Sequence, residues 1–159
     1  MTAAPIWYFA YGSNMNPARL ADDRLTPRGV AVEQRLLAAL PDWRLAFNKP
    51  WAKFNGAGAA NILPLAGGRV FGTINRMLPA GLDVLDEYEG VATGQYRRQP
   101  ITVFGGDGRP VQAITYIAEN VATTDLLPHR DYLAHLLAGR DLLPADYLAV
   151  LEAQACCGE

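Results

Sequence analysis

Two sets of residues in this sequence have the types and spacing needed for proton-transfer chemistry on an anionic ligand. The first is the turn Gly12-Ser13-Asn14, which directly follows an apolar and aromatic run over residues 6–11. The second is a single glutamate much further along the chain, Glu89. The turn is a candidate anion site, and the glutamate is a candidate general acid or base.

The turn joins a predicted strand to a predicted helix. Residues 6–11 are apolar on both sides of their alternation, so we expect a central strand that is buried on both faces. Asn16 and Pro17 are typical of a helix start, with Asn16 as the N-cap of a helix over residues 17–22. Such a turn directs backbone N–H groups into one small space, which suits an anion or a developing oxyanion. Glycine, serine and asparagine also form tight turns for conformational reasons alone, and this alternative stays open.

Glu89 continues the apolar stripe of a helix that we expect to begin at Pro79. At about 100° per residue, Leu78, Leu82, Leu85 and Glu89 fall on one side of this helix. The other carboxylates of the helix are expected to project towards water: Asp83, Asp86 and Glu87.

This placement allows two interpretations of Glu89. In the first, the side chain reaches solvent beyond the last turn of the helix. In the second, it faces a cavity bounded by Tyr88 and Tyr96, where desolvation raises its pKa towards the range of a general acid or base. Gly90, the predicted C′ residue of the helix, and Gly94 would let backbone or ligand approach this carboxyl closely.

The sequence offers little support for other chemistry. His129 and His135 are the only histidines, and neither has cysteines or carboxylates at the spacing of metal ligands. Ser13 has no evident histidine partner, so a serine hydrolase is unsupported. Cys156 and Cys157 are adjacent and near the C-terminus, where we expect free thiols. We therefore expect no metal site.

Composition indicates a single domain over residues 1–159, with residues 153–159 as a frayed tail. The net charge of −2 gives no electrostatic reason to expect nucleic acid or membrane as a partner. The apolar runs are too short to cross a bilayer, and the N-terminus lacks the pattern of a secretory signal. A cytoplasmic location is therefore expected.

The remaining pattern predicts about seven strands and four helices, most of the strands being joined by short turns. Pro41-Asp42 is expected to separate two strands within residues 29–48, and residues 49–61 are expected to form a loop. The other predicted strands are 62–65, 70–77, 96–104 and 111–117, and the last two predicted helices are 129–138 and 145–154. These elements favour an α+β fold with a mainly antiparallel, curled sheet and helices packed around it.

Taken together, these motifs resemble the γ-glutamylcyclotransferase family, which includes AIG2-like proteins. Tyr11-Gly12-Ser13-Asn14 resembles the substrate-binding turn of the family. Residues 85–90, followed by Gly94 and Tyr96, resemble the segment that carries its catalytic glutamate. Residues 113–117, which include Tyr116, resemble the strand that closes its pocket, and the two last helices resemble its C-terminal helices.

The resemblance implies a compact fold with a small β-barrel, and a reaction that uses no metal or other cofactor. In that reaction the α-amine of a γ-glutamyl compound attacks its own γ-carbonyl and releases 5-oxoproline and an amino acid or amine. Glu89 is implied as the catalytic base and then the acid. The implied substrate-binding residues are Tyr8, Phe9, Ala10, Tyr11, Gly12, Ser13, Asn14, Tyr96 and Tyr116. The expected partner is a small-molecule γ-glutamyl substrate, and the expected assembly is a monomer or weak homodimer.

Two questions stay open at the level of sequence. Residues 49–61, with the aromatics Trp51 and Phe54, do not match the family pattern, so the leaving group is not predicted. A non-catalytic ligand-binding or interaction module that keeps the same fold is the alternative function. Glu89 favours the enzyme, because a module without catalysis would be free to lose this glutamate.

Overall fold

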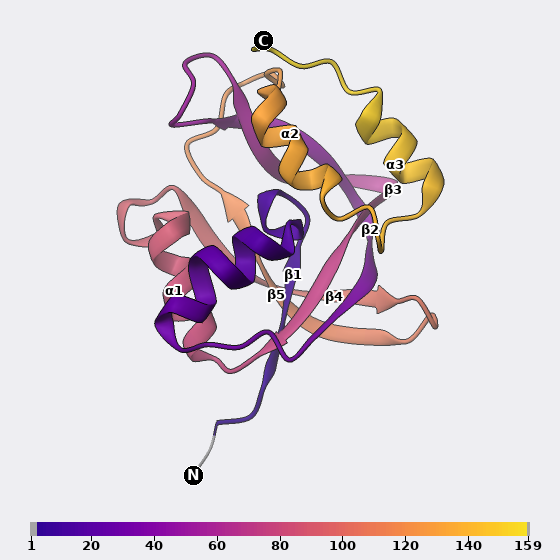
Figure 1. The fold of residues 1–159 in the computed structure, drawn as a ribbon. Helices are drawn as coiled ribbons and strands as arrows, with labels where there is room; N and C mark the ends of the chain where they lie inside the picture. The colour runs from indigo at the N-terminus through magenta and orange to yellow at the C-terminus, as the bar shows by residue number, and fades with distance from the viewer. Residues whose placement is uncertain (1–2, 159) are drawn as a thin grey trace.

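The protein folds as a closed barrel of five strands in the computed structural model, which describes residues 3–158 (Figure 1). The strands are β1 (Ile6–Ala10), β2 (Gln34–Pro50), β3 (Gly58–Met77), β4 (Tyr96–Gly105) and β5 (Pro110–Ala118). Their order around the barrel is β1-β3-β2-β4-β5, and each neighbouring pair is antiparallel except β1 with β5. The predicted α+β fold with a mainly antiparallel small barrel is confirmed.

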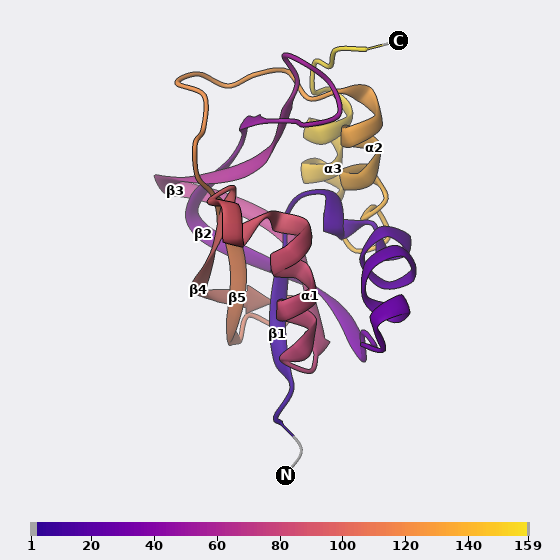
Figure 2. The same cartoon turned by 90° about the vertical axis from the view of Figure 1, so that its left-hand side faces the viewer.

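Helices flank this barrel. The α-helices are α1 (Ala80–Glu89), α2 (Arg130–Leu137) and α3 (Ala145–Glu152), and a π-helix, η2, covers Ala18–Leu25. Short 3₁₀ turns cover Ser13–Met15, Thr26–Arg28 and Val91–Thr93. Figures 1 and 2 show α2 and α3 beside each other near the end of the chain, with α1 on a different part of the barrel. Within residues 3–158, no helix is long and apolar enough to cross a membrane.

The structure has fewer strands than predicted, because two positions at which we expected strands to end lie opposite each other in the sheet. Pro41 pairs with Arg69 and Trp43 pairs with Pro64, so Asp42 lies opposite residues 65–68 in one irregular bulge. Asp42 has a φ of 67°, and its Oδ1 accepts a hydrogen bond of 3.0 Å from the N–H of Gly67. The predictions of separate strands on either side of these positions were therefore wrong. The bulge absorbs both irregularities while β2 and β3 continue.

The predicted loop over residues 49–61 is also shorter than expected. Lys49 pairs with Ala59 and Pro50 pairs with Gly58, so only residues 51–57 lie outside the two strands. A side chain at position 58 would come within 1.9 Å of the Phe47 carbonyl oxygen, so only glycine fits at this close approach. The hairpin between β2 and β3 thus places a short loop above one end of the barrel.

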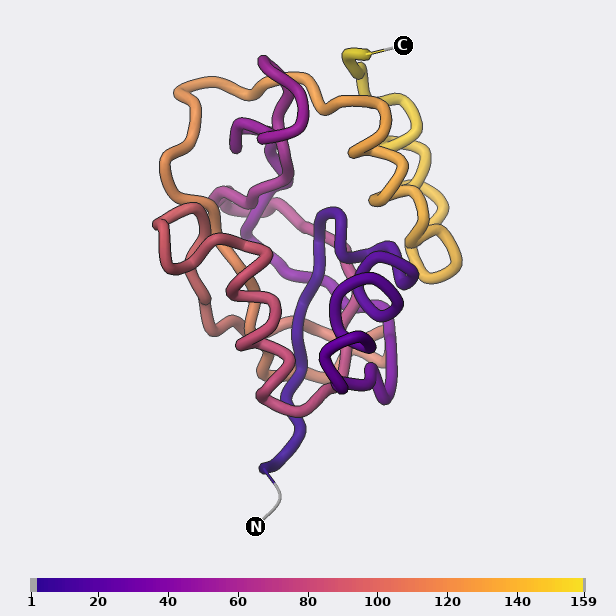
Figure 3. The backbone as a smooth tube through the Cα atoms, turned by 60° about the vertical axis from the view of Figure 1, so that its left-hand side comes forward, coloured from indigo at the N-terminus to yellow at the C-terminus, as the bar shows by residue number. Residues whose placement is uncertain are grey.

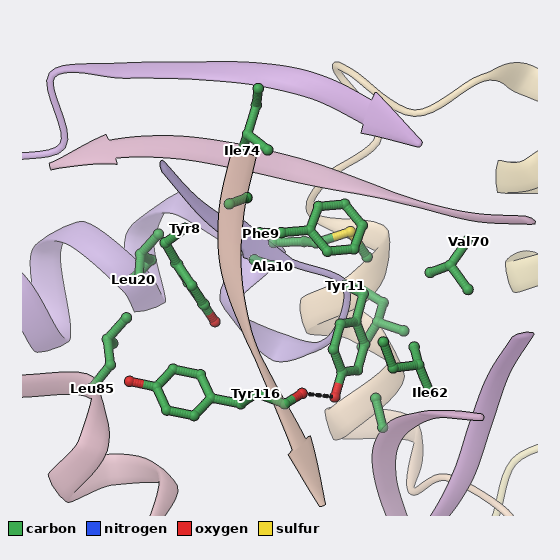
Figure 4. Packing of buried hydrophobic residues seen from close by; sticks show 14 of the residues in the cluster. Tyr8, Phe9, Ala10, Tyr11, Leu20, Ile62, Val70, Ile74, Leu85 and Tyr116 are labelled. Atoms are coloured by element: carbon green, nitrogen blue, oxygen red, sulfur yellow. Dashed lines mark hydrogen bonds between the residues drawn. The ribbon is translucent and has the colours of Figure 1, made fainter. Parts of the chain in front are cut away.

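The strand β1 is central and buried, as its apolar run predicts. It lies between β3 and β5 in the barrel, and Tyr8, Phe9 and Ala10 are buried. Figure 4 shows Tyr8, Phe9 and Ala10 among the packed core side chains. Helix α1 covers this core with Leu82 and Leu85, whereas Leu78, which the predicted stripe included, is 39% exposed before the helix begins.

The C-terminal tail is held in place over its described residues, 153–158, instead of being frayed as predicted. The N–H of Cys157 donates to the carbonyl of Pro128, and the N–H of Arg130 donates to the carbonyl of Cys157. These backbone hydrogen bonds hold the tail beside the segment that precedes α2. Figure 3 shows this tail and the N-terminal stretch before β1 at opposite ends of the molecule. Residue 159 lies outside the described residues.

Candidate active site

A pocket of about 320 Å³ lies where the turn after β1 meets the end of α1, the loop after β2 and the start of α2. This volume is at the lower end of the range for small-molecule sites. The residues that line it come from eight parts of the chain: Tyr8, Tyr11, Gly12, Ser13, Asn14, Arg19, Arg24, Lys49, Pro50, Trp51, Ala52, Lys53, Ala59, Ala60, Tyr88, Glu89, Gly90, Gln95, Tyr96, Thr115, Tyr116 and Tyr132.

The turn Gly12-Ser13-Asn14 forms one wall of this pocket. Its own hydrogen bonds run from the N–H of Met15 to the carbonyl of Gly12 and from the N–H of Asn16 to the carbonyl of Ser13. The N–H groups of Ser13 and Asn14 have no backbone partner in this turn within residues 3–158. A Cβ at position 12 would lie 3.0 Å from that of Ala60, so the turn packs tightly against β3. The wall therefore offers backbone donors to a ligand.

The side chain of Asn14 holds two other side chains of the pocket in place through hydrogen bonds. It is 3% exposed, its Nδ2 donates to the hydroxyl of Tyr8 over 3.0 Å, and its Oδ1 accepts from Arg24 over 2.9 Å. Because the Tyr8 hydroxyl accepts from Asn14, its own proton is free to bond another acceptor. Asn14 thus orients both a hydrogen-bond donor and a cation.

Glu89 lies at the last position of α1 and faces the pocket. Gly90 ends the helix with a φ of 65°, as predicted for its C′ residue. The side chain of Glu89 is 17% exposed, and an Nη1 of Arg24 lies 3.9 Å from its Oε1. Burial raises the pKa of the Glu89 carboxyl from its ordinary value of 4.5 to about 7, although the nearby charges of Arg24 and Arg19 lower it. A carboxyl with this pKa can accept and release a proton near neutral pH.

The expectation that the other carboxylates of α1 project towards water holds for Asp83 and Glu87 but not for Asp86. The side chains of Asp83 and Glu87 are 78% and 60% exposed. Asp86 instead accepts hydrogen bonds from the hydroxyl of Tyr116, over 2.7 Å, and from Arg98. This contact fixes the Tyr116 ring, which lies against Tyr8 edge-on with 5.9 Å between ring centroids.

Several predicted tyrosines gather in the pocket and are tied to the backbone. The hydroxyl of Tyr11 donates to the carbonyl of Tyr116 over 2.6 Å, a bond drawn as the dashed line in Figure 4. The hydroxyl of Tyr96 donates to the carbonyl of Ala60 over 3.0 Å. Burial, and then the charge of Glu89, raise the pKa of Tyr8 well above 10. Tyr8 therefore stays protonated and acts as a hydrogen-bond donor.

Two residues that the resemblance assigned to substrate binding do not line the pocket. Phe9 and Ala10 are 0% and 1% exposed and belong to the core. Successive side chains of a strand alternate between its faces, so the Phe9 ring points away from the face that carries Tyr8. The methyl group of Ala10 is enclosed by the core. Tyr8, Tyr11, Gly12, Ser13, Asn14, Tyr96 and Tyr116 do line the pocket, together with Glu89.

The pocket also contains cations and a tyrosine of α2 that the sequence did not predict as site residues. Arg19 and Arg24 come from η2, which begins one residue later than predicted and is a π-helix. Asn16 still forms a hydrogen bond at the start of η2, in which its Oδ1 accepts from the N–H of Ala18 over 3.1 Å. Lys49 is 6% exposed although it falls in a predicted loop. The hydroxyl of Tyr132 accepts from the N–H of Ala60 over 2.9 Å. No local pattern marks any of these four residues as part of a site.

The two aromatics of the loop between β2 and β3 behave differently. Trp51 lines the pocket and packs edge-on against Tyr132, with 5.5 Å between ring centroids. Phe54 is 41% exposed and packs against His129 outside the pocket. Cys156 and Cys157 are free thiols, and no group of three His, Cys, Asp or Glu side chains within residues 3–158 is placed to hold a metal ion.

Comparisons with known proteins agree with this barrel and pocket. The family model of the AIG2-like family matches residues 69–151. The chain is 30% identical to the gamma-glutamylcyclotransferase of Mus musculus and 29% identical to that of Homo sapiens. Each comparison spans 149 residues, 92% of this chain and 77% of the relative. A solved structure of a gamma-glutamyl cyclotransferase superposes with a TM-score of 0.85 and 27% identity, covering 98% of this chain and 90% of that one.

The fold and the pocket define this protein as a small barrel whose pocket holds a glutamate and a Gly-Ser-Asn turn. The chain belongs to the AIG2-like family of γ-glutamylcyclotransferase-like proteins. The resemblance drawn from the turn and the glutamate segment is thereby confirmed.

Proposed function

We propose that this protein is a γ-glutamylcyclotransferase in which Glu89 is the general base and then the general acid. The observation that carries the proposal is a carboxyl with a pKa of about 7 that faces a pocket lined in part by Ser13 and Asn14, the N–H groups of which have no backbone partner within residues 3–158. The similarity to gamma-glutamylcyclotransferases supports the same activity.

The proposed reaction balances with one carboxyl group and the substrate. Ionised Glu89 takes a proton from the α-ammonium of a γ-glutamyl compound, and the freed amine forms a bond to the γ-carbonyl carbon. The carbonyl oxygen becomes an oxyanion, which the N–H groups of Ser13 and Asn14 and the hydroxyl of Tyr8 are suited to bind. Protonated Glu89 then donates to the leaving nitrogen as the C–N bond breaks.

The products of this scheme are 5-oxoproline and a released amine. The ring nitrogen keeps one proton as the N–H of 5-oxoproline and gives its second proton, through Glu89, to that amine, which leaves as an ammonium. The nucleophile belongs to the substrate, so the protein supplies positioning, proton transfer and charge stabilisation. A reaction in which the substrate supplies the nucleophile fits a pocket that holds no activated serine or cysteine nucleophile among its lining residues.

A turnover screen over γ-glutamyl amino acids and γ-glutamyl amines, with 5-oxoproline as the readout, tests this proposal. We expect turnover by the wild type and a loss of about 10²- to 10⁴-fold in kcat for Glu89→Gln. Glu87→Gln is the matched control, because Glu87 lies on the same helix, is 60% exposed and does not line the pocket. Near-wild-type turnover by a folded Glu89→Gln variant contradicts the role of Glu89.

The same screen separates the enzyme from the alternative, a binding module. Binding of 5-oxoproline, measured as a rise in melting temperature, would accompany turnover in an enzyme. Stabilisation by 5-oxoproline with no turnover of any γ-glutamyl compound favours the module.

A further inference from the structure

Two arginines of η2, Arg19 and Arg24, reach the same pocket although they lie five positions apart. In an α-helix each residue turns by about 100°, so side chains five positions apart point about 140° away from each other. A π-helix instead bonds residue i+5 back to residue i, and its wider turn brings these two side chains to the same side of the helix. The N–H of Thr26 donates to the carbonyl of Ala21 in this manner. The π-helical winding of η2 is therefore what brings both guanidinium groups to the pocket.

Arg24 has partners within the protein. It donates to Asn14 over 2.9 Å, its guanidinium lies over the Tyr88 ring at 4.6 Å, and it is 3.9 Å from Glu89. These contacts hold Arg24 beside the carboxyl and leave its side chain 11% exposed. Arg24 thus serves as the fixed counter-charge of Glu89.

Arg19 lacks comparable partners. Its Nε atom is buried and has no hydrogen-bond partner within residues 3–158. Burial lowers the pKa of the Arg19 guanidinium, and the charge of Arg24 lowers it further. A buried donor without an acceptor costs about 1–3 kcal/mol, so such an arrangement is favourable mainly when a ligand supplies the acceptor.

The charge of the pocket points to the class of that ligand. Its lining residues include four cations, Arg19, Arg24, Lys49 and Lys53, and Glu89 is the one acidic residue among them. Glu89 carries only part of a negative charge near neutral pH, because its pKa is about 7. The pocket is therefore positive until an anion enters it, and a carboxylate matches the planar fork of an arginine.

We propose that Arg19 is a carboxylate-binding residue, which recognises a carboxylate group of the γ-glutamyl ligand. The identity of the ligand rests on the proposed function. Two sources of this carboxylate exist: the α-carboxylate of the glutamyl part, and the carboxylate of an amino acid as leaving group. Both present the same chemistry to the guanidinium, and binding experiments distinguish them.

The test measures ligand binding by calorimetry in a Glu89→Gln parent, in which turnover is removed. The probes are γ-glutamyl-alanine, γ-glutamyl-ethylamide, 5-oxoproline and 2-pyrrolidinone, which differ in the carboxylates that they carry. We expect Arg19→Gln to weaken binding of γ-glutamyl-alanine by about 10- to 100-fold. Arg109→Gln, at a hairpin-turn arginine that is 85% exposed and outside the pocket, is the control and should leave it unchanged.

The four probes decide which carboxylate Arg19 binds. Weaker binding of every carboxylate-bearing probe, with 2-pyrrolidinone unaffected, supports recognition of the glutamyl carboxylate. Weaker binding of γ-glutamyl-alanine alone supports recognition of the leaving group. Arg19→Lys, which keeps the charge and loses the fork, should weaken the same probes by a smaller factor and guards against misfolding of the glutamine variant.

The inference is overturned if a folded Arg19→Gln variant binds all probes within twofold of the Arg109→Gln control, or if no probe binds the parent. Its failure is distinct from that of the proposed function. Turnover by the wild type together with unchanged binding in Arg19→Gln rejects only the carboxylate role. Arg19-dependent binding without turnover of any γ-glutamyl compound rejects only the cyclotransferase activity.

Discussion

Replacing Glu89 by glutamine should stabilise the folded protein at neutral and alkaline pH while it removes the proposed base. Burial raises the pKa of this carboxyl from 4.5 to about 7, so in the folded state its ionised form is disfavoured relative to the unfolded state. Between these two values the folded wild type holds a proton that the unfolded chain has lost. The free energy of unfolding of the wild type therefore falls as pH rises through this window.

The size of this effect follows from the pKa difference. Each pKa unit corresponds to about 1.4 kcal/mol, so the full shift corresponds to about 3 kcal/mol. The side chain is only 17% exposed, so solvent screens little of this amount. Glutamine has nearly the same shape and carries no charge at any pH. The stability advantage of Glu89→Gln over the wild type should grow by about 2–3 kcal/mol between pH 5 and pH 8.

Urea denaturation of both proteins at intervals of pH measures this difference, and other titrating groups cancel because they are common to both. Glu87→Gln is the control, since its side chain is 60% exposed and its stability difference should stay within about 0.5 kcal/mol. A Glu89→Gln variant that is less stable than the wild type at pH 8, or whose difference does not change with pH, refutes the argument from desolvation.

Three further predictions concern the surroundings of the carboxyl. The kcat/KM of the wild type should rise with pH through about 7, the pKa of Glu89. Arg24→Met should move this rise to higher pH, because the charge of Arg24 lowers the pKa of Glu89. The pH–rate profiles of both proteins measure these two effects. Gly12→Ala should destabilise the protein by about 1–3 kcal/mol in urea denaturation, since the added Cβ would lie 3.0 Å from Ala60 and 3.2 Å from the Tyr132 hydroxyl; an unchanged midpoint contradicts this packing. Changing Cys156 and Cys157 to serine should leave turnover within about twofold of wild type, because neither thiol lines the pocket; a large loss would implicate the tail.

The strongest local signals predicted the parts of the site that lie on regular elements. The apolar run of β1 and the stripe that ends at Glu89 depend on periodicity within short stretches, and the turn after β1 depends on its residue types. Their placement in one pocket was expected only through the resemblance to a family. The predicted strand breaks were wrong, since no local pattern reveals that the irregularities near Asp42 and Gly67 face each other.

The sequence by itself determined that a carboxylate ends an apolar helical stripe and that a Gly-Ser-Asn turn follows a buried strand. Only the tertiary structure decided the electrostatics of the site. The five-residue spacing of Arg19 and Arg24 predicts no shared face until the π-helical winding of η2 is known. Lys49 enters the pocket because β2 and β3 continue to pair within the stretch that was expected to be a loop. The pKa of Glu89 likewise depends on burial and on charges from distant segments, which the packing of the barrel brings together.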